Sequence, residues 1–120
     1  MAIKNYADLK VWQKAMDLVD EVYRLVKLLP KYETYGLCDQ MRRASVSIPS
    51  NIAEGHSRNS SKHFLWFLGV ARGSKSELET QLIICVRQKY LTEKDTETAM
   101  KLCEEVGKML NSLMKSINCD

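Results

Sequence analysis

The chain contains few of the residues that interrupt a helical fold or cross-link a small one. Its 120 residues include only two prolines and five glycines and no serine- and glycine-rich stretch, which excludes a linker and predicts one domain over residues 1–120. The four cysteines are widely spaced, with no C-x-x-C pair, so neither a zinc site nor a disulfide framework is expected. Cys85 and Cys103 occupy apolar helical positions and are predicted to be buried.

Long apolar runs are missing as well. No segment approaches the roughly 20 apolar residues that span a membrane. Residues 1–12 lack the apolar core and cleavage site of a signal peptide. We therefore expect a cytoplasmic protein that does not contact a membrane.

Most signatures of catalysis and cofactor binding are also absent. The sequence has no Walker A motif, no G-x-G-x-x-G and no H-E-x-x-H. A di-iron bundle needs Glu-x-x-His pairs, but Ala53 and Ser60 stand three residues before His56 and His63. We expect no metal, no cofactor and no enzymatic activity.

One catalytic alternative remains open. Arg58, Asn59 and His63 read as R-N-x-x-x-H, which resembles the spaced Arg–His signature of HEPN-family ribonucleases, themselves small helical bundles. An arginine and a histidine could bind a phosphate and activate a ribose hydroxyl. The other interpretation of this segment is a polar loop between helices.

Apolar residues recur at three- and four-residue steps, which is typical of amphipathic helices. The segments that show this pattern are residues 8–29, 37–54, 60–90 and 92–117. Asp8, Ser60 or Ser61, and Thr92 are the expected N-caps. Because the connections are short, we predict an all-α, antiparallel up-down-up-down four-helix bundle.

Proline and glycine positions suggest local departures from regular helices. Pro49 predicts a kink or a break in the second helix, and Gly55 predicts its end. Gly69 and Gly73 lie four residues apart inside the third helix, where each costs about 1 kcal/mol relative to alanine. We expect them to permit close approach of a neighbouring backbone.

Polar residues at helical spacing form a second pattern. The set in the two middle helices is Arg43, Ser47, Asn51, Glu54, Ser74, Glu77 and Gln81. If the two helices face one another here, these side chains could form a buried network that fixes helix register. The alternative is a solvated surface.

Three stretches give the chain a family resemblance: LKVWQKAMDLVDEVY, QMRRASVSIPSNIAEGHSR and FLGVARGSKSELETQL. Together they resemble the 23S rRNA intervening-sequence proteins over roughly residues 9–113. The resemblance implies an antiparallel four-helix protomer that assembles as a ring, commonly a pentamer. It also implies a relationship to the accessory variability protein of diversity-generating retroelements, a more basic protein that binds nucleic acid and a reverse transcriptase.

Charge distribution favours an anion-binding surface or a solvated helix face. The formal net charge is only +3, but residues 40–91 carry eight basic and three acidic groups. An oligomer that binds RNA or DNA would multiply this excess. The candidate contacts are Arg42, Arg58, Lys62, Arg72, Lys75, Arg87 and Lys89. A further alternative is a protein-only scaffold whose subunits meet through aromatic residues such as Trp12, Tyr35 or Trp66.

Overall fold

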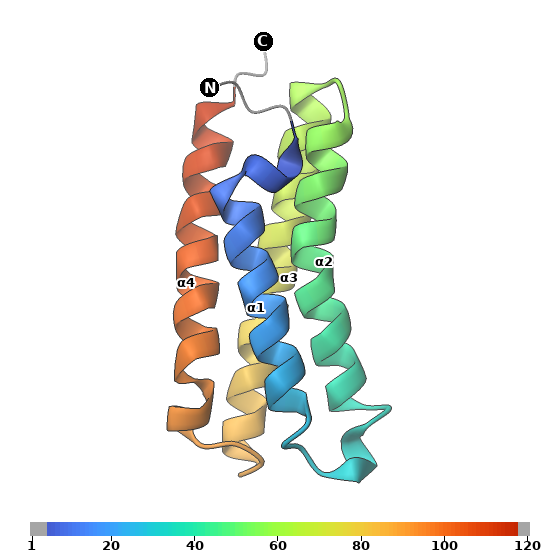
Figure 1. Cartoon of the computed structure of the whole chain (residues 1–120), viewed down its shortest axis with the longest axis vertical. Helices are drawn as coiled ribbons and strands as arrows, with labels where there is room; N and C mark the ends of the chain where they lie inside the picture. Colours follow the sequence, from blue (N-terminus) through green and yellow to red (C-terminus); the bar gives the residue numbers. More distant parts are fainter. Residues whose placement is uncertain (1–4, 118–120) are drawn as a thin grey trace.

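The computed structural model describes residues 5–117, which form four long helices and no strand. Two short 3₁₀ turns, η1 (Tyr6–Asp8) and η2 (Lys31–Glu33), precede the first and second helices. The long helices are α1 (Lys10–Val26), α2 (Leu37–Ser57), α3 (Ser61–Arg87) and α4 (Glu93–Ser116). Successive helices lie side by side and run in opposite directions (Figure 1), so the predicted all-α four-helix bundle is confirmed.

The core forms where the apolar faces of the four helices meet. Leu18 of α1, Ile48 of α2, Leu78 of α3 and Leu110 of α4 are all fully buried. Each helix packs against its neighbours in the chain, and α1 also packs against α4. The molecule measures 47 × 24 × 21 Å, the proportions of helices packed lengthwise around a shared core.

Two of the three predicted helix caps are confirmed. The side chain of Ser60 accepts a hydrogen bond from the His63 amide at the start of α3, and Thr92 caps α4. Asp8 does not cap α1, because it belongs to η1, whose own cap is Asn5. Helix α1 instead begins after Leu9, which makes no side-chain cap.

Helix α2 continues through Pro49, so the predicted break does not occur. Pro49 is buried and shares a surface hollow with Trp12 and Met16 of α1. Because α2 packs against both α1 and α3, contacts on two sides offset the roughly 3 kcal/mol that an internal proline costs a helix.

The glycines have roles different from those predicted. A Cβ atom on Gly69 or Gly73 would meet nothing within 4 Å, so the expected close backbone approach at these positions is wrong. The close approach occurs at buried Gly55, where a Cβ atom would lie 2.8 Å from Cβ of Phe67. Helix α2 also continues past Gly55 and ends at Ser57, so the glycine does not end the helix as predicted. Its small size instead lets α2 pack closely against α3.

The cysteines of the described chain are core residues, as predicted for Cys85 and Cys103. Cys38, Cys85 and Cys103 are buried free thiols, while Cys119 lies outside the described residues. Burial raises the pKa of Cys85 to about 11 and that of Cys103 to about 12. Both thiols are therefore protonated near neutral pH and have little nucleophilic reactivity.

Candidate nucleic-acid interface

The seven predicted RNA contacts do not form one continuous surface. Arg42 lies near the start of α2 and Arg58 directly follows its end, about 24 Å away at ~1.5 Å per residue. Lys62 and Arg87 lie at opposite ends of α3, about 37 Å apart, and Lys89 follows that helix. The structure divides the set into three groups by position. These groups are Arg42, Arg87 and Lys89 at the end that carries η2; Arg58 and Lys62 at the opposite end; and Arg72 and Lys75 on the middle of α3.

Two segments far apart in the sequence are joined at the end that carries η2 (Figure 1). The Tyr32 hydroxyl donates to the Tyr90 hydroxyl at 3.3 Å, and the Tyr90 hydroxyl donates to Glu33 Oε2 at 3.0 Å. The two tyrosine rings meet edge to face with centroids 6.1 Å apart. These hydrogen bonds raise the pKa of Tyr90 well above its ordinary value. We call this region, residues 27–36 and 87–92 together with Arg42, the tyrosine end.

Two aromatic rings of the tyrosine end are directed to solvent. Tyr35 is 94% exposed and Tyr32 is 77% exposed. Arg42 Nη2 donates to the Thr34 carbonyl at 3.3 Å, which anchors the loop beside Tyr35 to α2. The aromatic surface is therefore exposed while its backbone is held in place.

The tyrosine end also carries several cations without a carboxylate partner. Among residues 5–117, Lys27, Lys31, Arg87 and Lys89 are exposed, and none of them forms an ion pair. Of the acids nearby, Glu33 is already engaged, because its two oxygens accept from the Tyr90 hydroxyl and the Leu37 amide. Arg87 shares a surface hollow with Glu93 and Glu97, which offset part of its charge. Around Lys27, Lys31 and Lys89 the charge is positive and open to an anionic ligand.

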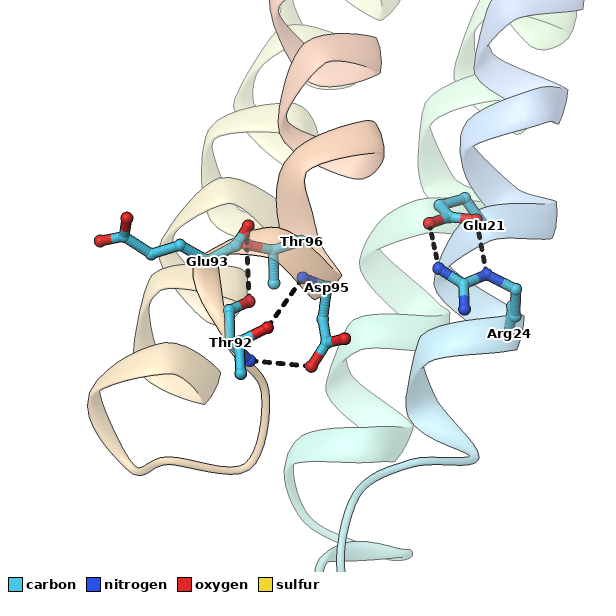
Figure 2. A network of polar contacts seen from close by, with 6 residues as sticks. All are labelled: Glu21, Arg24, Thr92, Glu93, Asp95 and Thr96. Carbon is cyan, nitrogen blue, oxygen red and sulfur yellow. Dashed lines mark hydrogen bonds and ion pairs between the residues drawn. The ribbon is translucent and has the colours of Figure 1, made fainter.

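The start of α4 is held by a network of hydrogen bonds around Thr92 (Figure 2). The Thr92 hydroxyl accepts from the Asp95 amide at 3.0 Å, and Asp95 Oδ2 accepts from the Thr92 amide at 2.9 Å, a reciprocal capping box. These hydrogen bonds lower the pKa of Asp95. On neighbouring α1, Arg24 pairs with Glu21 at 2.7 Å and so neutralises that acid locally.

At the opposite end, the two residues of the ribonuclease alternative have separate partners. Arg58 Nε donates to Glu54 at 2.9 Å, and its guanidinium carbon lies 5.2 Å from the centre of the Phe67 ring. His63 is exposed in the first turn of α3, where its amide donates to Ser60. No hydrogen bond joins the side chains of Arg58 and His63 in the part of the chain that the structure describes.

The middle group of cations is engaged within the bundle. Arg72 donates to Asn111 Oδ1 at 3.0 Å, which links α3 to α4. Lys75 pairs with Glu79 at 3.0 Å, and its side chain fills the space beside Gly107, where a Cβ atom would lie 3.1 Å from Lys75 Cε. Both residues link α3 to α4; Lys75 is mostly covered and poorly placed for an external phosphate, whereas Arg72 remains exposed.

The predicted polar network is smaller than expected. The Ser47 and Ser74 hydroxyls lie 2.8 Å apart between α2 and α3, and Asn51 Nδ2 donates to the Ser47 carbonyl at 2.7 Å and to its hydroxyl at 2.9 Å. The structure does not bring Arg43, Glu54 and Glu77 into this cluster. Arg43 and Glu54 bond to closer partners on their own helix, Asp39 and Arg58, and Glu77 is exposed. Gln81 is buried, and its Oε1 accepts no hydrogen bond from any described residue.

A further feature, not predicted from the sequence, is a partly exposed apolar surface between α1 and α2, on which Met16, Tyr23 and Val46 are the exposed residues. We call it the apolar seam, and its residues are Trp12, Met16, Val19, Tyr23, Val46, Pro49 and Ala53. Most of them line a surface hollow of about 330 Å³, and Tyr23 and Val46 continue into a second hollow of about 480 Å³ that reaches Arg42. The seam therefore runs toward the tyrosine end. Trp66, which is 63% exposed, lies apart from it on α3.

None of the helices within residues 5–117 has the length and apolarity needed to cross a bilayer. The same residues contain no group of three or more histidine, cysteine or acidic side chains placed to hold a metal ion.

These features define a four-helix bundle with a basic, tyrosine-bearing end and an exposed apolar seam. Residues 7–112 match the model of the 23S rRNA-intervening sequence protein family, and the chain belongs to this family. The family resemblance inferred from the sequence is thereby confirmed.

One solved structure is similar over nearly the whole bundle. It is a crystal structure of a Bacteroides thetaiotaomicron protein of unknown function from the S23 ribosomal protein family. The match has a TM-score of 0.81 and 26% sequence identity, and it covers 88% of this chain and 99% of that chain. No curated protein matches the sequence.

Proposed function

We propose that this protein is a non-enzymatic RNA-binding assembly, a homo-oligomeric ring whose subunits contact RNA through the tyrosine end. The observation that carries the proposal is the gathering of exposed, unpaired Lys27, Lys31, Arg87 and Lys89 at one end of the bundle. Cations without carboxylate partners release counterions when they meet phosphates, which is the main source of affinity for nucleic acids.

Self-association is supported by the apolar seam. Met16, Tyr23 and Val46 remain exposed on a single chain, and a contiguous apolar surface of this kind is typical of a protein interface. A ring forms when one surface of a subunit meets a different surface of the next. Because the seam reaches Arg42, assembly through it would place basic tyrosine ends close together and multiply their charge.

Binding of a structured RNA, followed by fluorescence anisotropy at several salt concentrations, tests the RNA component. We expect the affinity to fall steeply with salt. The double variant Lys31→Gln/Lys89→Gln should lower the magnitude of the log–log salt slope by about 1.4 to 1.8, which corresponds to two lost phosphate contacts.

The matched control is Lys62→Gln/Lys115→Gln, which removes two exposed lysines from the opposite end. It leaves the same net charge as the first double variant but should retain nearly all of the affinity. Salt-insensitive binding, no binding, or equal losses in the two double variants would each refute the assignment of RNA to the tyrosine end.

Light scattering tests the assembly component. The wild-type protein should have the mass of an oligomer, with a pentamer as the expectation from the family resemblance. Tyr23→Glu and Val46→Glu should reduce this mass, because each buries a charge in the seam, whereas Trp66→Glu should not. A monomeric wild type, or dissociation by the Trp66 substitution alone, would contradict the proposed interface.

A further inference from the structure

The exposed tyrosines require an explanation other than folding. Tyr35 is 94% exposed, so its ring contributes little apolar burial to the bundle. Tyr32 is mostly exposed as well, even though its hydroxyl is fixed by Tyr90. Packing in the core does not account for two exposed aromatic rings within four residues of one another. A surface that binds a ligand does account for them.

The surroundings of these rings match a site for nucleotides. Lys31 directly precedes Tyr32 and Lys89 directly precedes Tyr90, so two unpaired cations flank the tyrosine pair. Arg42 lies beside Tyr35 through its hydrogen bond to the Thr34 carbonyl. Aromatic rings that alternate with cations allow bases to stack while the phosphates are neutralised.

The backbone under the rings is already ordered. Glu33 accepts from the Tyr90 hydroxyl and the Leu37 amide, and so links the α3–α4 connection to the start of α2. The Thr34 hydroxyl donates to the Lys31 carbonyl at 2.7 Å. A loop fixed in this way loses little conformational entropy when a ligand binds.

We propose that Tyr32 and Tyr35 stack on unpaired bases, which makes the tyrosine end a site for single-stranded rather than duplex RNA. The inference rests on the proposed RNA-binding function and adds the class of RNA that is bound. In a duplex the bases already stack on one another and do not receive a protein ring, whereas splayed-out bases in loops and single strands do. Duplex RNA would still meet the cations, but without the stacking contribution.

The test compares one labelled strand in two states by anisotropy at fixed salt. The probe is a single-stranded RNA of about 12 nucleotides, and the comparison is the same strand annealed to its complement. Tyr35→Ala should weaken single-strand binding about 5- to 150-fold, the effect of one lost stack, and should change duplex binding less than about twofold. Tyr35→Phe keeps the ring and should retain the wild-type preference. Because Tyr35 is almost fully exposed, neither substitution disturbs the core.

The outcomes separate this inference from the proposed function. If Tyr35→Ala and Tyr32→Ala leave single-strand affinity unchanged while Lys31→Gln/Lys89→Gln weakens binding, the stacking inference is overturned and the RNA-binding function stands. Equal losses on single strand and duplex in the tyrosine variants overturn it as well. If the wild-type protein binds neither RNA, both proposals fail.

Discussion

The glycines offer a sharp test of the helix packing, because three of them sit in different surroundings within regular helices. At Gly55 a Cβ atom would lie 2.8 Å from Phe67 Cβ and 3.0 Å from Phe64 Cδ1. At Gly73 it would meet nothing within 4 Å. Gly107 is intermediate, because its nearest neighbour is the flexible end of Lys75. The same substitution to alanine should therefore have three different effects.

The magnitudes follow from two opposing contributions. Alanine gains up to about 1 kcal/mol over glycine inside a helix. Overpacking against an atom close to the backbone costs about 1 to 3 kcal/mol. We expect Gly55→Ala to destabilise the protein by about 1 to 2 kcal/mol, Gly73→Ala to stabilise it by about 0.5 to 1 kcal/mol, and Gly107→Ala to be nearly neutral.

Thermal unfolding followed by circular dichroism measures these differences. Unfolding entropy for a chain of this length is about 0.25 kcal/mol per degree, so Gly55→Ala should lower Tm by roughly 4 to 8 °C and Gly73→Ala should raise it by roughly 2 to 4 °C. A rise in Tm for Gly55→Ala would refute the close approach of α2 and α3. A fall in Tm for Gly73→Ala would show that another chain covers this side of α3. It would refute the prediction that an alanine side chain fits here without a clash.

The remaining predictions concern the helix ends and the ribonuclease alternative. Lys89 adopts a left-handed backbone conformation with φ of 65°, so Lys89→Gly should raise stability by about 1 kcal/mol while it weakens RNA binding, as denaturant unfolding and anisotropy would show. Thr92→Ala removes the α4 cap and should cost about 1 kcal/mol, and an unchanged Tm would contradict this. Because the pKa of Asp95 is lowered in the folded protein, its ionised carboxylate stabilises the fold above its unfolded-state pKa of about 3.9, and this stabilisation is lost as the pH falls. Asp95→Asn should therefore reduce the loss of stability on acidification, as denaturant unfolding at several pH values would show. His63→Ala should leave any RNA cleavage by the preparation unchanged, and a specific loss of cleavage would favour the ribonuclease alternative.

The helices and their number could be predicted from the sequence because apolar periodicity is a local signal. Ser60 and Thr92 were identifiable as caps for the same reason, since a cap acts on amides two or three residues away. Local reasoning failed where tertiary contacts decide the outcome. Packing of α2 on two sides keeps it continuous at Pro49, and Gly55 rather than Gly69 meets a neighbouring helix.

The site was less predictable because its parts come from distant segments. Tyr32 and Tyr90 are 58 residues apart, so no local pattern relates them. Counting basic residues located Arg42, Arg87 and Lys89, but it could not separate them from cations that are engaged inside the bundle, such as Lys75. The apolar seam was hidden for a similar reason. Met16 has the spacing of a core residue and Val46 lies beside the apolar face of its helix, and only the packed helices show that both remain exposed.

The most direct test of the account is to locate bound RNA on the chain. Ultraviolet crosslinking of the wild-type protein to a single-stranded RNA, followed by mass spectrometry of the crosslinked peptides, identifies the contacting segments. We predict crosslinks in residues 28–42 and 87–94, with Tyr32 and Tyr35 as the main sites. Crosslinks confined to residues 54–66 at the opposite end of the bundle would contradict the assignment of the tyrosine end as the RNA surface.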